Sequence, residues 1–114
     1  MGQSIRYVRR GIRGRSVQNF NWPGVITAKS VVHITAGEVG FGTTQKTATA
    51  PAQDFYYHVG DADIWVSNVS PHRNEFNGDP GGVTYVLHVG WDSPLDVAVT
   101  ITVEDALPVE IQGY

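Results

Sequence analysis

Alternation of apolar and polar residues is the dominant pattern along this chain. It is clearest from Leu95 to Val103, where every odd position is a large aliphatic residue and every even position is small or polar. The stretch from Val83 to Trp91 alternates in the same way. Since successive side chains of a strand point to opposite faces, each stretch predicts a strand with one face in the core. Residues 92–94, Asp-Ser-Pro, favour a turn, so we expect these two strands to pair as a β-hairpin.

Weaker versions of the pattern predict further strands. We expect them at residues 25–35 (as one or two strands), 39–41, 55–59, 62–69 and 107–111. Gly60 and Asp61 suit a tight turn between two of these strands. Residues 42–53 are small and polar, which is typical of a surface loop or a weak edge strand. The last strand is entered through Pro108, and proline favours a sheet edge because it lacks a backbone donor.

Many short strands without helical periodicity predict an all-β fold. A chain of 114 residues is long enough for one hydrophobic core and too short for two, so we expect a single domain over residues 1–114. Turn signals at about every 8 to 12 residues are typical of an antiparallel β-sandwich, here jelly-roll-like, with a barrel as the alternative architecture. Such folds host many functions, so the fold identifies none.

Charge is distributed unevenly. Residues 1–15 contain none of the eleven acidic residues and five of the eight basic ones, namely Arg6, Arg9, Arg10, Arg13 and Arg15. Apolar residues are interleaved among these arginines, which favours an edge strand that docks on its own body or on a neighbouring subunit. The alternative is an arm for nucleic acid or anionic lipid. The net charge of −3 and the pI of about 5.7 oppose nucleic-acid binding.

Cysteine and long apolar runs are both absent from the sequence. Without cysteine there is no disulfide framework, and the opening residues do not form a signal peptide as they stand, so a cytoplasmic location is favoured. Because no run of 18 apolar residues occurs, we expect no membrane-spanning helix.

Motifs of catalytic and metal sites are missing as well. There is no GxSxG elbow and no glycine-rich phosphate loop. The four histidines, His33, His58, His72 and His88, lack the close pairing of zinc ligands. We therefore expect a protein that is not an enzyme and that holds no cofactor.

The most polar stretch is SPHRNEFNGDPGG, residues 70–82. An EF-hand read from Glu75 fails, since Pro80 takes the glycine position and Val86 the closing glutamate position. A looser calcium site stays open as an alternative. The simpler interpretation is a long hairpin connection in which Pro71 ends the strand and residues 79–82 make a turn. The candidate ligand-contact residues of this stretch are His72, Arg73, Asn74, Glu75, Asn77 and Asp79, and the calcium site would use Asn74, Glu75, Asn77 and Asp79 with backbone carbonyls.

Aromatic residues beside polar ones give the best functional signal. Trp65 shares a strand face with Asp63 and Ser67, and Tyr56 lies among polar residues on the preceding strand. Flat aromatic faces with polar neighbours suit the binding of sugar rings, although such residues also pack between sheets. Trp22, in a turn-rich loop, either caps the core or forms an exposed tip.

Three functions are compatible with these observations. The first is a lectin-like, non-catalytic module that binds a carbohydrate or another small ligand through Trp65, Tyr56, Trp22 and the loop residues 72–79. The second is a homo-oligomeric assembly protein whose arginine-rich segment contacts an acidic neighbour. The third is nucleic-acid binding through that same segment.

Overall fold

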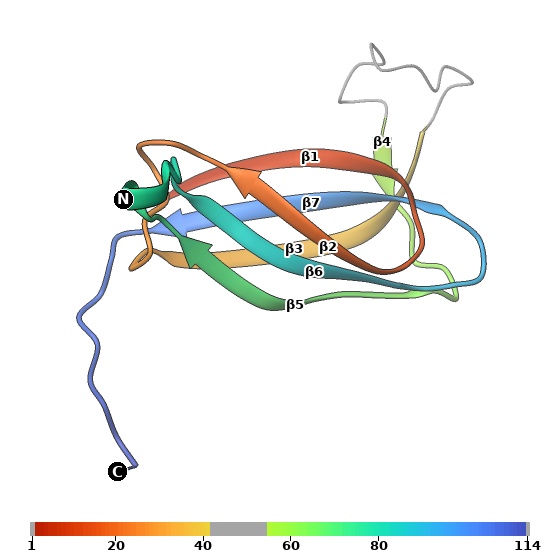
Figure 1. Ribbon diagram of the computed structural model, residues 1–114. Helices are drawn as coiled ribbons and strands as arrows, with labels where there is room; N and C mark the ends of the chain where they lie inside the picture. Colours follow the sequence, from red (N-terminus) through yellow and green to blue (C-terminus); the bar gives the residue numbers. More distant parts are fainter. Residues whose placement is uncertain (1, 42–54, 114) are drawn as a thin grey trace.

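The chain folds into two antiparallel β-sheets that pack face to face (Figure 1). The computed structural model describes residues 2–41 and 55–113. Sheet A has the strand order β1-β7-β3-β4, and sheet B has the order β2-β6-β5. The all-β sandwich expected from the sequence is confirmed, and the sheets do not close into a barrel. The strands are β1 (Gln3–Ile12), β2 (Gly14–Asn21), β3 (Val31–Phe41), β4 (Phe55–Tyr57), β5 (Asp63–His72), β6 (Gly82–Gly90) and β7 (Leu95–Glu104).

The core lies between the central strands β6 and β7. Their inward side chains are the alternating apolar residues of the sequence, and none of them is more than 5% exposed. This confirms the predicted faces of both strands except at Trp91, which follows β6 and is 42% exposed. The inward residues are Val83, Tyr85, Leu87 and Val89 of β6, and Val97, Val99, Ile101 and Val103 of β7.

The predicted hairpin of β6 and β7 is wrong. β6 pairs with β2 and β5 in sheet B, whereas β7 pairs with β1 and β3 in sheet A. Residues 91–94 therefore cross from one sheet to the other. The physical reason is burial: two strands with strongly apolar faces exclude most water when those faces meet across the core. Gly60 and Asp61 likewise lie in a crossing, between β4 of sheet A and β5 of sheet B.

The basic segment forms an edge strand that docks on its own body, which confirms one of its two interpretations. β1 pairs with β7 from Gln3–Val103 to Arg9–Val97 and lies at the margin of sheet A. A single residue, Arg13, separates it from β2 in the other sheet, with the flanking Gly11 and Gly14 at positive φ. Glycine adopts this conformation without steric conflict, which lets the chain change sheets so abruptly.

β3 begins later than the sequence indicates. The expected strand at 25–35 is wrong in its first part, because the carbonyl of Trp22 accepts the N–H groups of both Val25 and Ile26 and bends the chain into a turn. The Ile26 side chain enters the core and is 1% exposed. From Val31 a single strand then runs through the expected short strand at 39–41. Residues 42–53, expected to be a loop or weak edge strand, lie outside the described residues.

The segment after β7 is not a strand, so the expected strand at 107–111 is also wrong. Residues 105–113 have no assigned secondary structure and extend away from the sandwich (Figure 1). Leu107, Val109 and Ile111 are 63%, 73% and 74% exposed. β7 already has β1 and β3 as neighbours, so no open edge beside it awaits the continuing chain.

Helical structure contributes little to this architecture. A three-residue 3₁₀ helix, Glu75–Asn77, lies in the connection between β5 and β6. Across residues 2–41 and 55–113, no helix has the length and apolar character needed to cross a lipid bilayer.

Candidate functional site

The candidate ligand-contacting side chains lie mainly on the outer face of sheet B. The register of its three strands aligns residues from β5, β6 and β2 in rows across the sheet. A Ser67–Ser70 irregularity in β5 shifts the register once, so Trp65 and His72 both point to this outer face. From one end to the other, the rows are Trp65–His88–Arg15, Ser67–Val86–Val17, Ser70–Thr84–Asn19 and His72–Gly82–Asn21.

Trp65 stacks on His88, its neighbour on β6. The two rings are parallel, with an interplanar angle of 3° and centroids 4.6 Å apart. The His88 ring is itself fixed, because its Nε2 lies 2.7 Å from the Ser67 hydroxyl. Trp65 remains 49% exposed. One face of the indole is therefore covered by His88, and the rest of the ring is available for contact.

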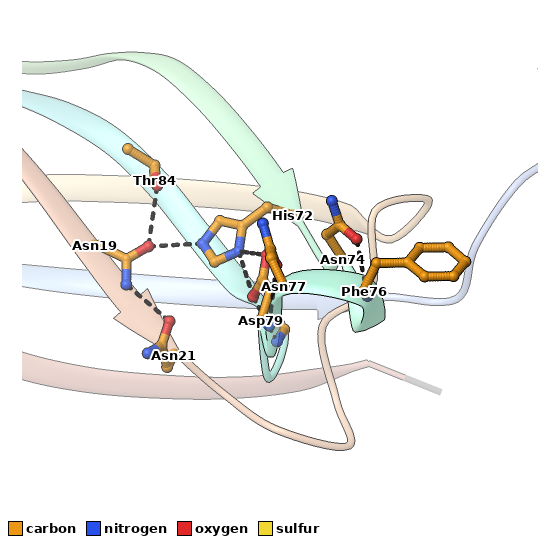
Figure 2. A network of polar contacts seen from close by, with 9 residues as sticks. Asn19, Asn21, His72, Asn74, Phe76, Asn77, Asp79 and Thr84 are labelled. Carbon is orange, nitrogen blue, oxygen red and sulfur yellow. Dashed lines mark hydrogen bonds and ion pairs between the residues drawn. The ribbon is translucent and has the colours of Figure 1, made fainter.

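A polar network centred on His72 occupies the other end of the face (Figure 2). The Nδ1 of His72 lies 2.7 and 2.9 Å from the two carboxylate oxygens of Asp79. Its Nε2 lies 2.7 Å from Oδ1 of Asn19 on β2. That oxygen also accepts the Thr84 hydroxyl, at 3.0 Å. The ring thus links the β5–β6 connection to β2 across the central strand.

The orientation of the Asn19 amide determines which of its atoms faces His72. Its Nδ2 donates to Oδ1 of Asn21 at 2.8 Å, so its Oδ1 is the atom turned toward His72. Both ring nitrogens of His72 therefore face oxygen atoms, those of Asp79 on one side and that of Asn19 on the other.

Asp79 supplies the negative charge of the network. The pKa of its carboxyl lies below the ordinary value of 3.8, chiefly because the backbone N–H of Gly81 donates to it, with the hydrogen bond from His72 adding to the effect. Hydrogen bonds to a carboxylate favour its ionised form. Asp79 is thus an ionised anchor at the end of the loop.

The loop residues act mainly as capping groups. Asn74 Oδ1 accepts the N–H of Phe76 at 3.0 Å, and Asn77 Oδ1 accepts the N–H of Asp79 at 3.2 Å. Arg73 and Glu75 form an exposed ion pair at 2.9 Å. Gly78 follows the 3₁₀ helix at a φ of 78°. These contacts give the polar residues ordinary turn roles, as the hairpin interpretation expects.

That interpretation is supported by the pairing of the flanking strands. The connection joins β5 to β6, which are antiparallel neighbours. β5 runs two residues past the expected break, through Pro71 to His72, because β5 is an edge strand and tolerates proline. Within the described ranges, no cluster of three or more His, Cys, Asp or Glu residues has the geometry to hold a metal ion.

Two predicted site residues lie elsewhere. Tyr56 is 52% exposed on β4 at the far edge of sheet A, with its hydroxyl close to Gly40. Trp22 is partly buried, packs edge-on against Phe20 and joins the periphery of the core. Trp22 therefore caps the core instead of forming an exposed tip. The structure brings Trp65 and His72 onto one face, with the loop residues at its end.

Several residues of this face were missed from the sequence. Asn19 and His88 make main contacts of the face and were not proposed, whereas Ser67 was expected on the same strand face as Trp65. The alternation of β6 already placed His88 opposite to the core residues, which was the available signal. What was lacking was the register, since the pairing of β5 and β2 with β6 decides which residues meet.

A separate small hollow lies near the crossing from β4 to β5. It encloses about 240 Å³ and is lined by Glu38, His58, Asp61 and Trp91, together with Gly60, Ala62 and Leu95. Trp91 is 42% exposed there. The hollow is a second place where an aromatic ring stands beside polar groups.

Comparison of the chain with protein-family models, with curated proteins and with solved structures finds no match.

Proposed function

We propose that this protein is a non-catalytic binding module that recognises a carbohydrate on the outer face of sheet B. The observation that carries the proposal is the half-exposed Trp65, stacked on His88. A sugar ring has an apolar face that packs on an indole and hydroxyl groups that need directional partners. Hydroxyl and amide groups of Ser70, Thr84 and Asn19 lie further along the same face.

The His72–Asp79 pair supports binding better than catalysis. A histidine oriented by a carboxylate serves as a general base only when its second nitrogen is available to a reacting group. In this network that nitrogen lies against Asn19 Oδ1 at 2.7 Å. The pair instead holds the loop in place beside the proposed binding face.

The test is glycan binding by matched aromatic variants. We expect the native chain to bind members of a glycan array, and Trp65→Ala to weaken that binding by about tenfold or more, as loss of a central aromatic contact does. Tyr56→Ala is the control, because Tyr56 has nearly the same exposure but lies on sheet A. Isothermal titration with the best glycan of the array gives the dissociation constants.

The outcomes separate the face from the hollow. Loss of binding in Trp91→Ala with Trp65→Ala unaffected would move the site to the hollow at Glu38 and overturn the assignment to sheet B. An array without any signal would remove the carbohydrate proposal altogether.

A second candidate function is self-assembly, and a specific observation favours it. The segment after β7 exposes alternating apolar residues, and it is acidic where β1 is basic. Exposed apolar segments of this kind mark interaction sites.

Nucleic-acid binding is less well supported by the positions of the arginines. Arg6 bonds Thr100 on the outside of sheet A, Arg9 lies over the ring of Tyr7, and Arg15 lies on the outer face of sheet B. A phosphate backbone is bound best by a single basic footprint, and these side chains point in different directions.

A further inference from the structure

We infer that residues 105–113 add as a strand to β1 of a second copy of this chain, extending that copy's sheet A. The inference rests on the second candidate function, self-assembly, and is independent of the carbohydrate proposal. It begins with the pattern of the segment, in which odd-numbered Leu107, Val109 and Ile111 are apolar and strongly exposed. A period of two is the pattern of a strand with one buried face, yet in the described part of the chain this segment has no sheet to join.

Pro108 fixes which side of the segment pairs. In a strand, backbone N–H groups of even and odd residues point to opposite sides. Pro108 lacks an N–H, so it is tolerated where the backbone groups of the even residues point away from the neighbouring strand. The odd residues Leu107, Val109 and Ile111 then provide the backbone hydrogen bonds to the acceptor, and the segment is suited to the outermost position of a sheet.

β1 is the acceptor edge that is best suited to this segment. β4 has only three residues, and β5 carries an irregularity at Ser67–Ser70 and Pro71. Short length, bulges and proline are devices that prevent an edge from accepting another strand. β2 is shorter than β1 and offers Ser16 and Gln18 at inward positions. β1 has an irregularity only near its end, between Arg9 and Ile12, and pairs regularly from Gln3 to Arg9; among the described strands none lies beyond it in sheet A.

Both faces of β1 complement the segment. Ile5 and Tyr7 point inward and pack against the core, so the apolar side chains of an added segment would lie beside them. The outward face carries Arg6, and the even-numbered face of the segment carries Glu110. An arginine on an edge strand discourages neutral or basic strands, whereas an acidic strand gains a cross-strand ion pair.

The second copy follows from this complementarity, because each chain holds one acidic segment and one basic edge. Two copies that exchange their segments reciprocally close into a dimer, since each edge and each segment is then used once. The segment belongs to the exposed extension and not to the core, so variants in it leave the sandwich intact.

The first experiment measures mass in solution by light scattering after size exclusion. We expect the full chain to give at least twice its 12.4 kDa at high concentration and to dissociate on dilution. Val109→Lys places a charge in the apolar row and should raise the dissociation constant by about tenfold or more. Val109→Ile is the matched control, because it changes the same position but keeps the row apolar, and it should leave the mass unchanged.

The second experiment identifies the acceptor by charge exchange. Arg6→Glu and Glu110→Arg should each weaken association, and the double variant should restore it, because the ion pair is re-formed with reversed signs. Arg15→Glu on β2 is the control and should have little effect. Restoration by an Arg15→Glu, Glu110→Arg pair instead would overturn the assignment to β1.

Three results are distinguishable. A monomeric native chain overturns both self-assembly and this inference. A segment that pairs with β1 of its own chain would give this monomeric result. A multimer that is insensitive to Val109→Lys keeps self-assembly and overturns the role of the segment. Loss of glycan binding without a change of mass concerns only the carbohydrate proposal.

Discussion

At the scale of single residues, His72 and Asp79 decide how the β5–β6 connection is held. The connection is exposed along most of its length, and Phe76 at its tip is fully exposed with its ring directed away from the network (Figure 2). Its fixed point is the carboxylate of Asp79, which receives hydrogen bonds from Gly81 and His72. The charge of Asp79 therefore contributes to the order of the loop, together with the caps made by Asn74 and Asn77.

That dependence predicts a pH effect for Asp79→Asn. Because the pKa of Asp79 is lowered in the folded chain, its contribution to stability is present above the ordinary value of 3.8 and is lost as the pH falls through the folded-state pKa. We expect Asp79→Asn to have a lower melting temperature than the native chain at pH 7, and the difference to close as the pH falls below 3.8 and through the folded-state pKa. Thermal melts followed by circular dichroism across this range test it.

Glu75→Gln serves as the control for the charge change. Glu75 forms an exposed pair with Arg73, and such pairs contribute little to stability. A melting-temperature difference for Asp79→Asn that is the same at every pH would contradict the role given to its charge.

At the scale of elements, strand faces could be predicted from the sequence but strand partners could not. The alternation in residues 83–89 and 97–103 correctly gives the side chains that enter the core, whereas Trp91 lies after β6 and is 42% exposed. The alternation contains no information on whether Leu87 and Val99 lie side by side in one sheet or face each other across the core. The same limit explains the site, since Trp65 and His72 could be proposed as ligand contacts, whereas their partners His88 and Asn19 depend on register.

Gly82 shows how tightly the central strand is held at its start. It pairs with Asn21 of β2 on one side and His72 of β5 on the other. A Cβ atom at this position would lie 2.5 Å from the carbonyl oxygen of Phe20 and 2.8 Å from the Cα of Asn21. Both are backbone atoms of β2, so they move only if the β2–β6 pairing opens.

We therefore expect Gly82→Ala to lower the free energy of unfolding by about 1–3 kcal/mol, as overpacking typically does. Urea denaturation measures the change. Gly90→Ala at the other end of β6 is the matched control. The atom nearest to the added Cβ would be the backbone carbonyl oxygen of Asp63, at 3.2 Å. An equal loss in both variants would show that the close approach to β2 is not the cause.

At the scale of the whole molecule, the two sheets share one core and should unfold together. Leu87 lies in that core and is 0% exposed, facing the inner residues of β7. All three tryptophans lie in or directly after strands of sheet B, whereas circular dichroism reports on both sheets. The two signals therefore distinguish one cooperative unit from two.

Leu87→Ala is expected to lower the free energy of unfolding by about 2–5 kcal/mol, the range for cavities in a packed core. Tryptophan fluorescence and circular dichroism should still give coincident urea transitions, as one shared core requires. Leu87→Met preserves the volume and should lose less than about 1.5 kcal/mol. Separate transitions for the two signals would contradict a single core.

The pairing of β1 with β7 has a consequence for the way the protein is synthesised. Among the described strands the ribosome makes β1 first and β7 last, so Gln3 has no strand partner until Val103 has been made. During that time the strand has neither its sheet nor its core contacts, and nascent chains on one messenger RNA lie close together. Because the emerging segment carries arginines and no acidic residue, neighbouring nascent chains repel one another. The arginines therefore oppose the association of incomplete chains before sheet A has formed.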